Sequence, residues 1–98
     1  MIIQLFIGID FKLGENNMER ILKQGIYRHF KGSDKLYKVI GIATHSESLE
    51  EMVIYIALYG KEIGKTYVRP LDMFLEKVPE GRDNPNNQVY RFEYLRDS

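Results

Sequence analysis

The middle third of the chain alternates between aliphatic residues and tyrosine or histidine. Successive side chains of a β-strand point to opposite faces of a sheet, so this alternation predicts strands with two different faces. The aliphatic set consists of Ile26, Ile40, Ile42, Ile54, Ile56 and Leu58. The other set consists of Tyr27, His29, Tyr37, His45, Tyr55 and Tyr59. We expect the aliphatic face to form the core, and the face of tyrosines and imidazoles to contact a polar partner.

The whole pattern predicts a mainly β protein. Strands are expected at about residues 1–9, 26–30, 36–45, 52–59, 66–69 and 88–95. The segment 31–35 is a predicted hairpin loop. A short helix is expected over 16–24, capped by Asn16 and ended by Gly25. A single helical turn should follow Pro70, because proline cannot donate to a ladder and suits the first position of a helix.

Short strands with little helix favour a small antiparallel barrel over a helical bundle. The 98 residues are enough for one domain with a single modest core. We expect an N-terminal strand and short helix extension over residues 1–24, followed by a barrel domain over residues 25–95. The segment 79–87, which contains glycine, proline and asparagine, is predicted to be the most mobile.

The composition excludes several classes of function. The chain has no cysteine, which rules out disulfides, a thiolate nucleophile and a cysteine–zinc cluster, and fits a reducing cytoplasm. The apolar N-terminal segment lacks the basic leader and small-residue cleavage site of an export signal. It is also shorter than the about 20 apolar residues that span a bilayer. A cytoplasmic protein without a membrane partner is therefore expected.

The net charge is zero, with 14 basic and 14 acidic residues, which argues against binding nucleic acid by bulk charge. The charges are unevenly spread, however. Residues 20–38 contain six basic residues, which form a basic strip, and a single acidic residue, Asp34. The strip consists of Arg20, Lys23, Arg28, Lys31, Lys35 and Lys38. It could attract a phosphate or carboxylate. The alternative is a lysine-rich edge that discourages strand-to-strand aggregation.

A series of short motifs follows the predicted strands in order. They are Gly25-Ile-Tyr-Arg-His-Phe-Lys-Gly32, Tyr37-Lys-Val39, His45-Ser-Glu47, Val53-Ile-Tyr55, Leu58-Tyr59, Val68-Arg-Pro70 and Arg91-Phe92. With these motifs the chain resembles the bacterial domain-of-unknown-function family sixteen-fifty-three, a group of small proteins with an SH3-type barrel. The resemblance covers residues 25–92 and implies a small SH3-like antiparallel barrel, but no established activity. Tyr67 stands where the family usually has tryptophan, so a stacking role there would be weaker.

His29 and His45 share the predicted polar face, and pairing of their strands could bring them close to each other and to Glu47. Such a set suits a divalent metal or general acid–base chemistry, so a small metal-dependent hydrolase is one alternative function. The spacing has none of the regularity of known zinc motifs. The simpler interpretation is that each histidine bonds a carbonyl or packs on a tyrosine, with no catalytic residue, metal or cofactor.

Arg69 is the most suggestive single charge, because it precedes a proline that fixes the backbone and shares a predicted face with Tyr67. A guanidinium beside an aromatic ring can pair bidentately with a carboxylate or phosphate. The alternative is an internal salt bridge from Arg69 to Glu76 or Glu47.

These patterns favour a non-catalytic binding or adaptor module for a peptide or protein segment. The expected ligand-binding residues are Tyr27, His29, Tyr37, His45, Glu47, Tyr55, Tyr59, Tyr67 and Arg69. Single-stranded nucleic acid, bound by the basic strip from Arg28 to Lys38, is the next alternative. A structural interpretation also stands, in which the rings close the ends of a small barrel or form a homodimer seam.

Overall fold

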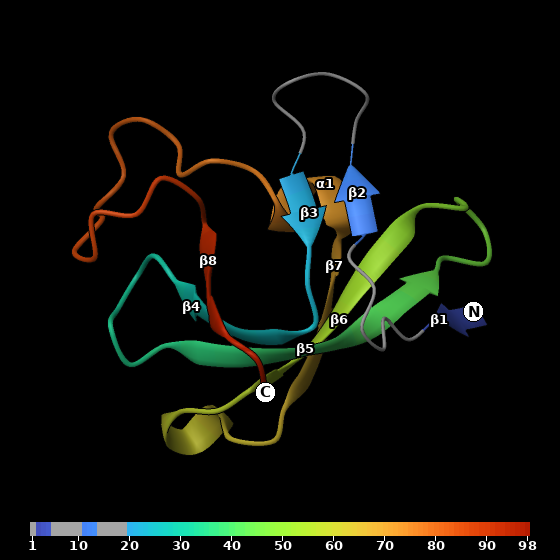
Figure 1. The fold of residues 1–98 in the computed structure, drawn as a ribbon, viewed down its shortest axis with the longest axis horizontal. Coiled ribbons are helices and arrows are strands. Elements are labelled where there is room, and N and C mark those ends of the chain that lie inside the picture. Colours follow the sequence, from blue (N-terminus) through green and yellow to red (C-terminus); the bar gives the residue numbers. More distant parts are fainter. Residues whose placement is uncertain (1, 5–10, 14–19) are drawn as a thin grey trace.

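The computed structural model describes residues 2–4, 11–13 and 20–98 of the chain. Its main feature is an antiparallel sheet in which five strands follow the order β7-β6-β5-β4-β8 (Figure 1). These strands are β4 (Gly25–His29), β5 (Leu36–Thr44), β6 (Glu51–Ala57), β7 (Thr66–Pro70) and β8 (Phe92–Arg96). The prediction of a mainly β protein is confirmed.

The N-terminal part adds three short strands. β1 (Ile2–Gln4) pairs with the second half of β5, and β2 (Phe11–Leu13) pairs with β3 (Arg20–Leu22) in a separate hairpin. The helix predicted over residues 16–24 is not formed at Arg20–Leu22, which are strand, and its residues 16–19 lie outside the described part of the chain. Of the strand predicted over residues 1–9, the part Ile2–Gln4 is observed. Residues 1 and 5–9 lie outside the described part of the chain.

Gly25 starts β4 instead of ending a helix. Its φ is +151°, and a Cβ at this position would lie 2.6 Å from the carbonyl oxygen of Arg96. Glycine is therefore required for β8 to approach the beginning of β4 this closely.

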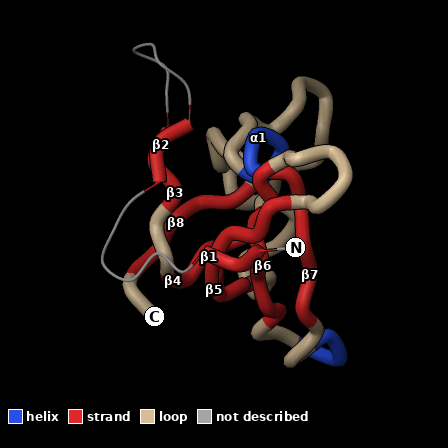
Figure 2. Tube along the Cα trace, turned by 90° about the vertical axis from the view of Figure 1, so that its right-hand side faces the viewer, coloured by secondary structure: helices blue, strands red, loops and turns tan. Residues whose placement is uncertain are grey.

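Two short helical elements lie at opposite ends of the curved sheet (Figure 2). α1 (Leu71–Phe74) directly follows Pro70, as predicted, and buries Leu71 and Phe74 against the sheet. The 3₁₀ turn η1 (Gly60–Glu62) joins β6 to β7. Among the described residues, no helix has the length and apolar character needed to cross a membrane.

The two predicted faces exist, but the tyrosine–histidine face is turned toward the core, and the aliphatic face is buried only in part, with Ile26 7% and Ile54 8% exposed. Tyr27 is 1% exposed, Tyr55 5% and His29 8%, so the tyrosine–histidine face turns inward. They pack with Val39, Val53 and the buried rings of α1 and β8 in the core. Large rings fill the interior of a small curved sheet more completely than aliphatic side chains of the same number.

A β-bulge explains why the aliphatic set did not stay together. The register between β5 and β6 shifts between Val39 and Gly41, so Ile42 joins Val39 in the core. Ile40 is half-buried, and Leu58, beyond the end of β6, is exposed. One extra residue in a strand turns the side chains that follow to the other face, and no alternation pattern reports it.

The edge strands β7 and β8 are bridged by side chains. The Arg69 guanidinium of β7 lies over the ring of Phe92 in β8, 5.5 Å from its centre. The Phe92 ring also stacks on Phe74 of α1, with centres 4.1 Å apart. Phe92 thereby links both edges of the sheet to the helical turn.

Candidate binding surface

Four side chains form the tyrosine surface, which begins near η1 and the β4–β5 hairpin loop and extends along β7 toward α1. They are Tyr37, Tyr59, Tyr67 and Arg69, all half-buried. Tyr37 is at the centre, since its ring centre lies 5.2–6.4 Å from those of five neighbouring rings. Those neighbours are His29, Tyr55, Tyr59, Tyr67 and Phe92. The surface is therefore the outer layer of the aromatic core.

Hydrogen bonds fix the tyrosine hydroxyl groups. The Tyr37 and Tyr59 hydroxyl oxygens are 2.9 Å apart. Burial raises the pKa of Tyr37, and the hydrogen bond with Tyr59 raises it further. Tyr37 therefore stays neutral at physiological pH, and a hydroxyl group of this kind can donate or accept a hydrogen bond.

Tyr67 donates to Glu62, with 2.8 Å between the hydroxyl and carboxylate oxygens. The same carboxylate oxygen lies 3.0 Å from the Lys65 ammonium. The hydrogen bond from Tyr67 and the pairing with Lys65 lower the pKa of Glu62. This carboxylate is thus ionised and already neutralised by its own lysine.

Arg69 makes neither of the salt bridges considered from the sequence. Its Nε donates to the Tyr55 hydroxyl over 3.3 Å, its guanidinium lies over Phe92, and Glu76 instead pairs with Arg91. Within the described residues, no carboxylate lies in salt-bridge distance of Arg69. Its contacts orient the guanidinium without cancelling its charge.

His29 lies behind the tyrosine surface in a basic environment. Its ring stacks on Phe30 and meets Phe92 edge-on, with centres 4.8 Å apart in both cases. Its pKa is lowered from 6.5 to about 4, mainly by burial and in addition by four cations: Lys31, Arg69, Arg91 and Lys35. Its Nδ1 accepts the backbone N–H of Lys31 at 3.2 Å, as expected of a neutral ring. The imidazole is a packed, uncharged core residue.

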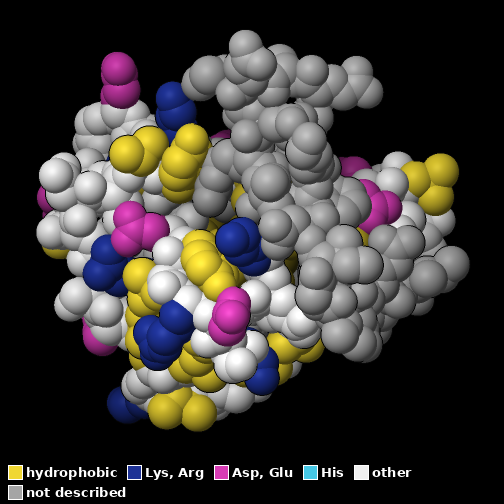
Figure 3. All heavy atoms as spheres, viewed as in Figure 1, with side chains coloured by type: hydrophobic (Ala, Val, Ile, Leu, Met, Phe, Trp, Pro, Cys, Tyr) yellow, Lys and Arg dark blue, Asp and Glu magenta, His cyan; other side chains and the backbone are white. Residues whose placement is uncertain are grey.

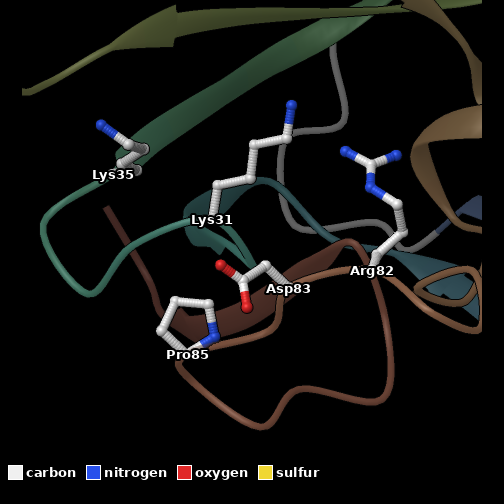
Figure 4. A pocket seen from close by; sticks show the side chains of 5 residues that line it. All are labelled: Lys31, Lys35, Arg82, Asp83 and Pro85. Carbon is white, nitrogen blue, oxygen red and sulfur yellow. The ribbon is translucent and has the colours of Figure 1, made fainter.

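A basic pocket adjoins the tyrosine surface. It has a volume of about 390 Å³ and is lined by Lys31, Lys35, Arg82, Asp83 and Pro85 (Figure 4). The two lysines come from the β4–β5 hairpin loop, and the other three residues from the loop between α1 and β8. Arg82 and Asp83 were not expected at a site, because no local sequence signal shows that their loop lies beside the hairpin.

The predicted basic strip is divided between surfaces. Arg28 pairs with Glu93 and donates to Gln88. Tyr37 and Val39 point inward, so Lys38 between them points to the opposite face. The face in Figure 3 likewise shows lysine and arginine side chains dispersed among hydrophobic ones in its lower left part. Among the described side chains of the strip, Arg28 is therefore paired, Lys38 points to the opposite face, and Lys31 and Lys35 line the basic pocket.

The two histidines are not brought together. The backbone of His29 bonds Lys35, just before β5, whereas His45 follows the last residue of this nine-residue strand. Strand geometry separates these positions by about 30 Å. His45 Nδ1 accepts the backbone N–H groups of Glu47 and Ser48, each at 3.2 Å, and so organises a turn. The structure gives no support to a site that joins His29, His45 and Glu47.

Among residues 22–98, no three histidine, aspartate or glutamate side chains are arranged to hold a metal ion. Tyr27 is also withdrawn from the surface, because its hydroxyl bonds the backbone of Lys23 inside the fold. The arrangement that remains consists of half-exposed rings, phenolic hydroxyls and cations.

Comparison with known proteins gives a family but no activity. A family model described as "Protein of unknown function (DUF1653)" matches residues 25–94. A solved structure, "Crystal structure of a protein belonging to pfam DUF1653 from Bordetella bronchiseptica", is similar with a TM-score of 0.63 and 30% sequence identity. The similarity covers 79% of this chain and 91% of that one. No curated protein matches. Since the family model spans well over half of the chain, this protein belongs to the DUF1653 family of proteins of unknown function.

Proposed function

We propose that this protein is a non-catalytic binding module that holds an extended peptide or protein segment on its tyrosine surface. The observation that carries the proposal is the Arg69 guanidinium, which is half-buried among rings and has no carboxylate partner in the described residues. A desolvated guanidinium in an aromatic setting is a strong anchor for a ligand carboxylate. Burying it without such a partner is costly.

The tyrosines supply the rest of a recognition surface. Tyr37, Tyr59 and Tyr67 present flat apolar rings together with hydroxyl groups, a combination that dominates many binding sites because it buries area at low entropic cost. The core beneath fixes their positions through Tyr55 and Phe92. A surface so pre-organised loses little freedom when it binds.

We also propose that residues 25–95 form an SH3-like barrel domain and that residues 1–24 are an extension to it. The bridge between β7 and β8 through Arg69 and Phe92 supports closure of the barrel. The family match, which begins at residue 25, supports the boundary.

A proline-rich peptide with one glutamate is the probe that tests the proposal. We expect its addition to shift amide signals of the tyrosine surface in NMR spectra of the full chain. Tyr67→Ala should weaken binding about tenfold, because a central aromatic anchor often carries this much of an interface. Arg69→Met should abolish the preference for the glutamate peptide over its glutamine analogue.

Tyr94→Ala is the matched control, since Tyr94 is equally half-buried against the core but lies outside the tyrosine surface. Equal weakening in both tyrosine variants would argue against a specific site. A short single-stranded RNA forms the competing arm. If RNA binds more tightly than the peptide and its affinity falls steeply with salt, the ligand is nucleic acid and the peptide proposal is wrong.

A further inference from the structure

The cations of the basic pocket keep their charge. Lys31, Lys35 and Arg82 line it, and among the described residues none of them lies in salt-bridge distance of a carboxylate. Asp83 lines the same pocket, yet in Figure 4 its carboxylate points away from the charged ends of Lys31 and Arg82. The pocket therefore has an excess of two positive charges and no internal partner for them.

Aromatic rings hold two of these cations in place. The Lys35 ammonium lies 4.7 Å from the centre of the Tyr59 ring, and the Arg82 guanidinium lies 5.4 Å from that of Phe30. A ring orients a cation without neutralising it, unlike a carboxylate. Arg28 and Arg91 show the contrast, because each is paired with a glutamate. The pocket cations are positioned yet still available.

The loop between α1 and β8, which forms one wall of the pocket, is attached to β4 by hydrogen bonds, although the sequence of residues 79–87 predicts a mobile segment. Gln88 is 5% exposed and its amide donates to the carbonyl oxygens of Arg28 and Tyr90. Asn86 donates to the carbonyl oxygen of His29 over 3.1 Å. The loop is thus fastened to the end of β4, next to the hairpin that carries the two lysines. Arg82 of this loop and Lys31 of the hairpin therefore line the same pocket.

The pocket is continuous with the tyrosine surface. Lys35 connects the two. It lines the pocket, and its ammonium lies over the ring of Tyr59, whose hydroxyl bonds that of Tyr37. The volume of about 390 Å³ lies at the small end of the range for ligand sites, about 300–1,000 Å³. It accommodates a charged side chain or a phosphate group but not a large cofactor.

We propose that the basic pocket binds an oxyanion, a carboxylate or phosphate group, of the same segment that the tyrosine surface holds. The inference rests on the proposed function for the identity of the segment, but not for the anion itself. The ligand would then be an acidic or phosphorylated peptide that crosses Lys35 on its way from the rings to the pocket.

Inorganic phosphate and acetate, used alone, test the pocket without any peptide. Each is titrated into the full chain at constant ionic strength and followed by NMR. We expect saturable shifts at Lys31, Lys35 and Arg82, and about fivefold to tenfold weaker binding in Lys31→Met and Arg82→Met. Asp83→Asn should tighten binding about twofold to threefold, because it removes the one opposing charge. A correctly dispersed spectrum shows that each variant is folded.

Lys23→Met is the matched control. Lys23 is also held over a ring, that of Tyr94, but lies outside the pocket. The proposal is overturned if this variant loses as much affinity as Lys31→Met, or if the shifts spread over all exposed basic residues. Tighter binding of phosphate than of acetate would identify a phosphoryl group as the natural ligand, and comparable binding would identify a carboxylate.

A second readout comes from the His29 ring. Lys31 and Lys35 of the hairpin, Arg69 of β7 and Arg91 before β8 all act on this imidazole. A bound anion offsets part of their charge, so the pKa of His29 should rise from about 4 when phosphate is present. An unchanged pKa at a saturating phosphate concentration would contradict binding at this position.

Peptides separate the two proposals. A phosphoserine or glutamate peptide should bind more tightly than its glutamine analogue, and the double variant Lys31→Met/Arg82→Met should remove that difference. If phosphate binds in the pocket but none of the peptides binds to the protein, the proposed function is wrong and the anion site is still supported. If peptides bind without regard to charge, the pocket inference fails and the tyrosine surface stands.

Discussion

The two histidines of the chain lie beside opposite ends of strand β5, His29 at the end of β4 and His45 just after β5, and their surroundings differ sharply. At the Leu36 end, His29 is packed among Phe30, Tyr37 and Phe92 with cations close by. At the Thr44 end, His45 is half-exposed and caps a polar turn. The same residue type serves as a core ring at one end and as a turn cap at the other.

Burial among aromatic residues, more than residue identity, distinguishes the environments of the two histidines. The His29 end has rings that support cations, which is the basis of both proposals. The turn at the other end has Glu47, Ser48 and Glu50 around His45 and no ring contact of this kind in residues 22–98. Substitutions and pH changes at the two ends test this contrast.

Phe92→Ala should cause the largest loss of stability, about 3–5 kcal/mol, because Phe92 is 1% exposed and its removal leaves a cavity beneath Arg69, Tyr37 and Phe74. Chemical denaturation monitored by circular dichroism measures the free energy of unfolding. Ser46→Ala, at the exposed turn of the other end, should change it by less than about 0.5 kcal/mol. Similar losses in both variants would contradict the contrast.

The pH dependence of stability should reveal the buried imidazole. The pKa of His29 is lowered from 6.5 to about 4 in the folded protein, so between these values the unfolded chain binds a proton that the folded protein does not. Stability from this residue is fully present above pH 6.5 and falls as the pH drops toward about 4, by up to about 3 kcal/mol.

Urea unfolding at a series of pH values measures this slope. His29→Gln should flatten the curve between pH 4 and 6.5, whatever its effect on stability at neutral pH. A slope that persists in this variant would assign the pH dependence to other groups.

Tyr37→Phe should cost about 1 kcal/mol, the usual net contribution of one hydrogen bond, because it removes the bond to the Tyr59 hydroxyl and keeps the ring packing. Tyr59→Phe should cost a similar amount. The double variant should lose much less than the sum of the two, and a thermodynamic cycle of denaturation free energies measures the difference. Strict additivity would show that the hydroxyl pair contributes nothing.

Leu49→Asn should have the smallest effect and the opposite sign, at the other end of β5. Leu49 has a φ of +65° and is 72% exposed, so it adopts left-handed backbone without compensating burial. Asparagine tolerates this conformation, and we expect a gain of about 0.5–1 kcal/mol in thermal or chemical denaturation. A loss would mean that the Leu49 side chain stabilises the turn.

Much of the fold was predictable from local signals. The strands from Gly25 to Pro70, the hairpin loop between β4 and β5, and the turn α1 after Pro70 were all predicted close to their observed positions. The alternation of two residue types along β4, β5 and β6 is real as well. What the alternation does not contain is the direction of each face, since it reports only that neighbouring residues point apart.

The candidate site was predictable in part. Tyr37, Tyr59, Tyr67 and Arg69 were expected at a binding surface, and all four are half-buried in the structure. Arg82 was missed, because its loop lies far along the chain from the hairpin that it approaches.

The sequence by itself determined the strand content, the hairpin and the motifs that lead to the DUF1653 family, because these depend on neighbours within a few residues. Only the tertiary structure decided that tyrosine faces inward, that the bulge at Ile40 and Gly41 redirects β5, and that His29 and His45 are apart. It also decided that cations from two distant loops share one pocket. Such outcomes depend on sheet curvature and on packing between segments many residues apart, which local patterns do not encode.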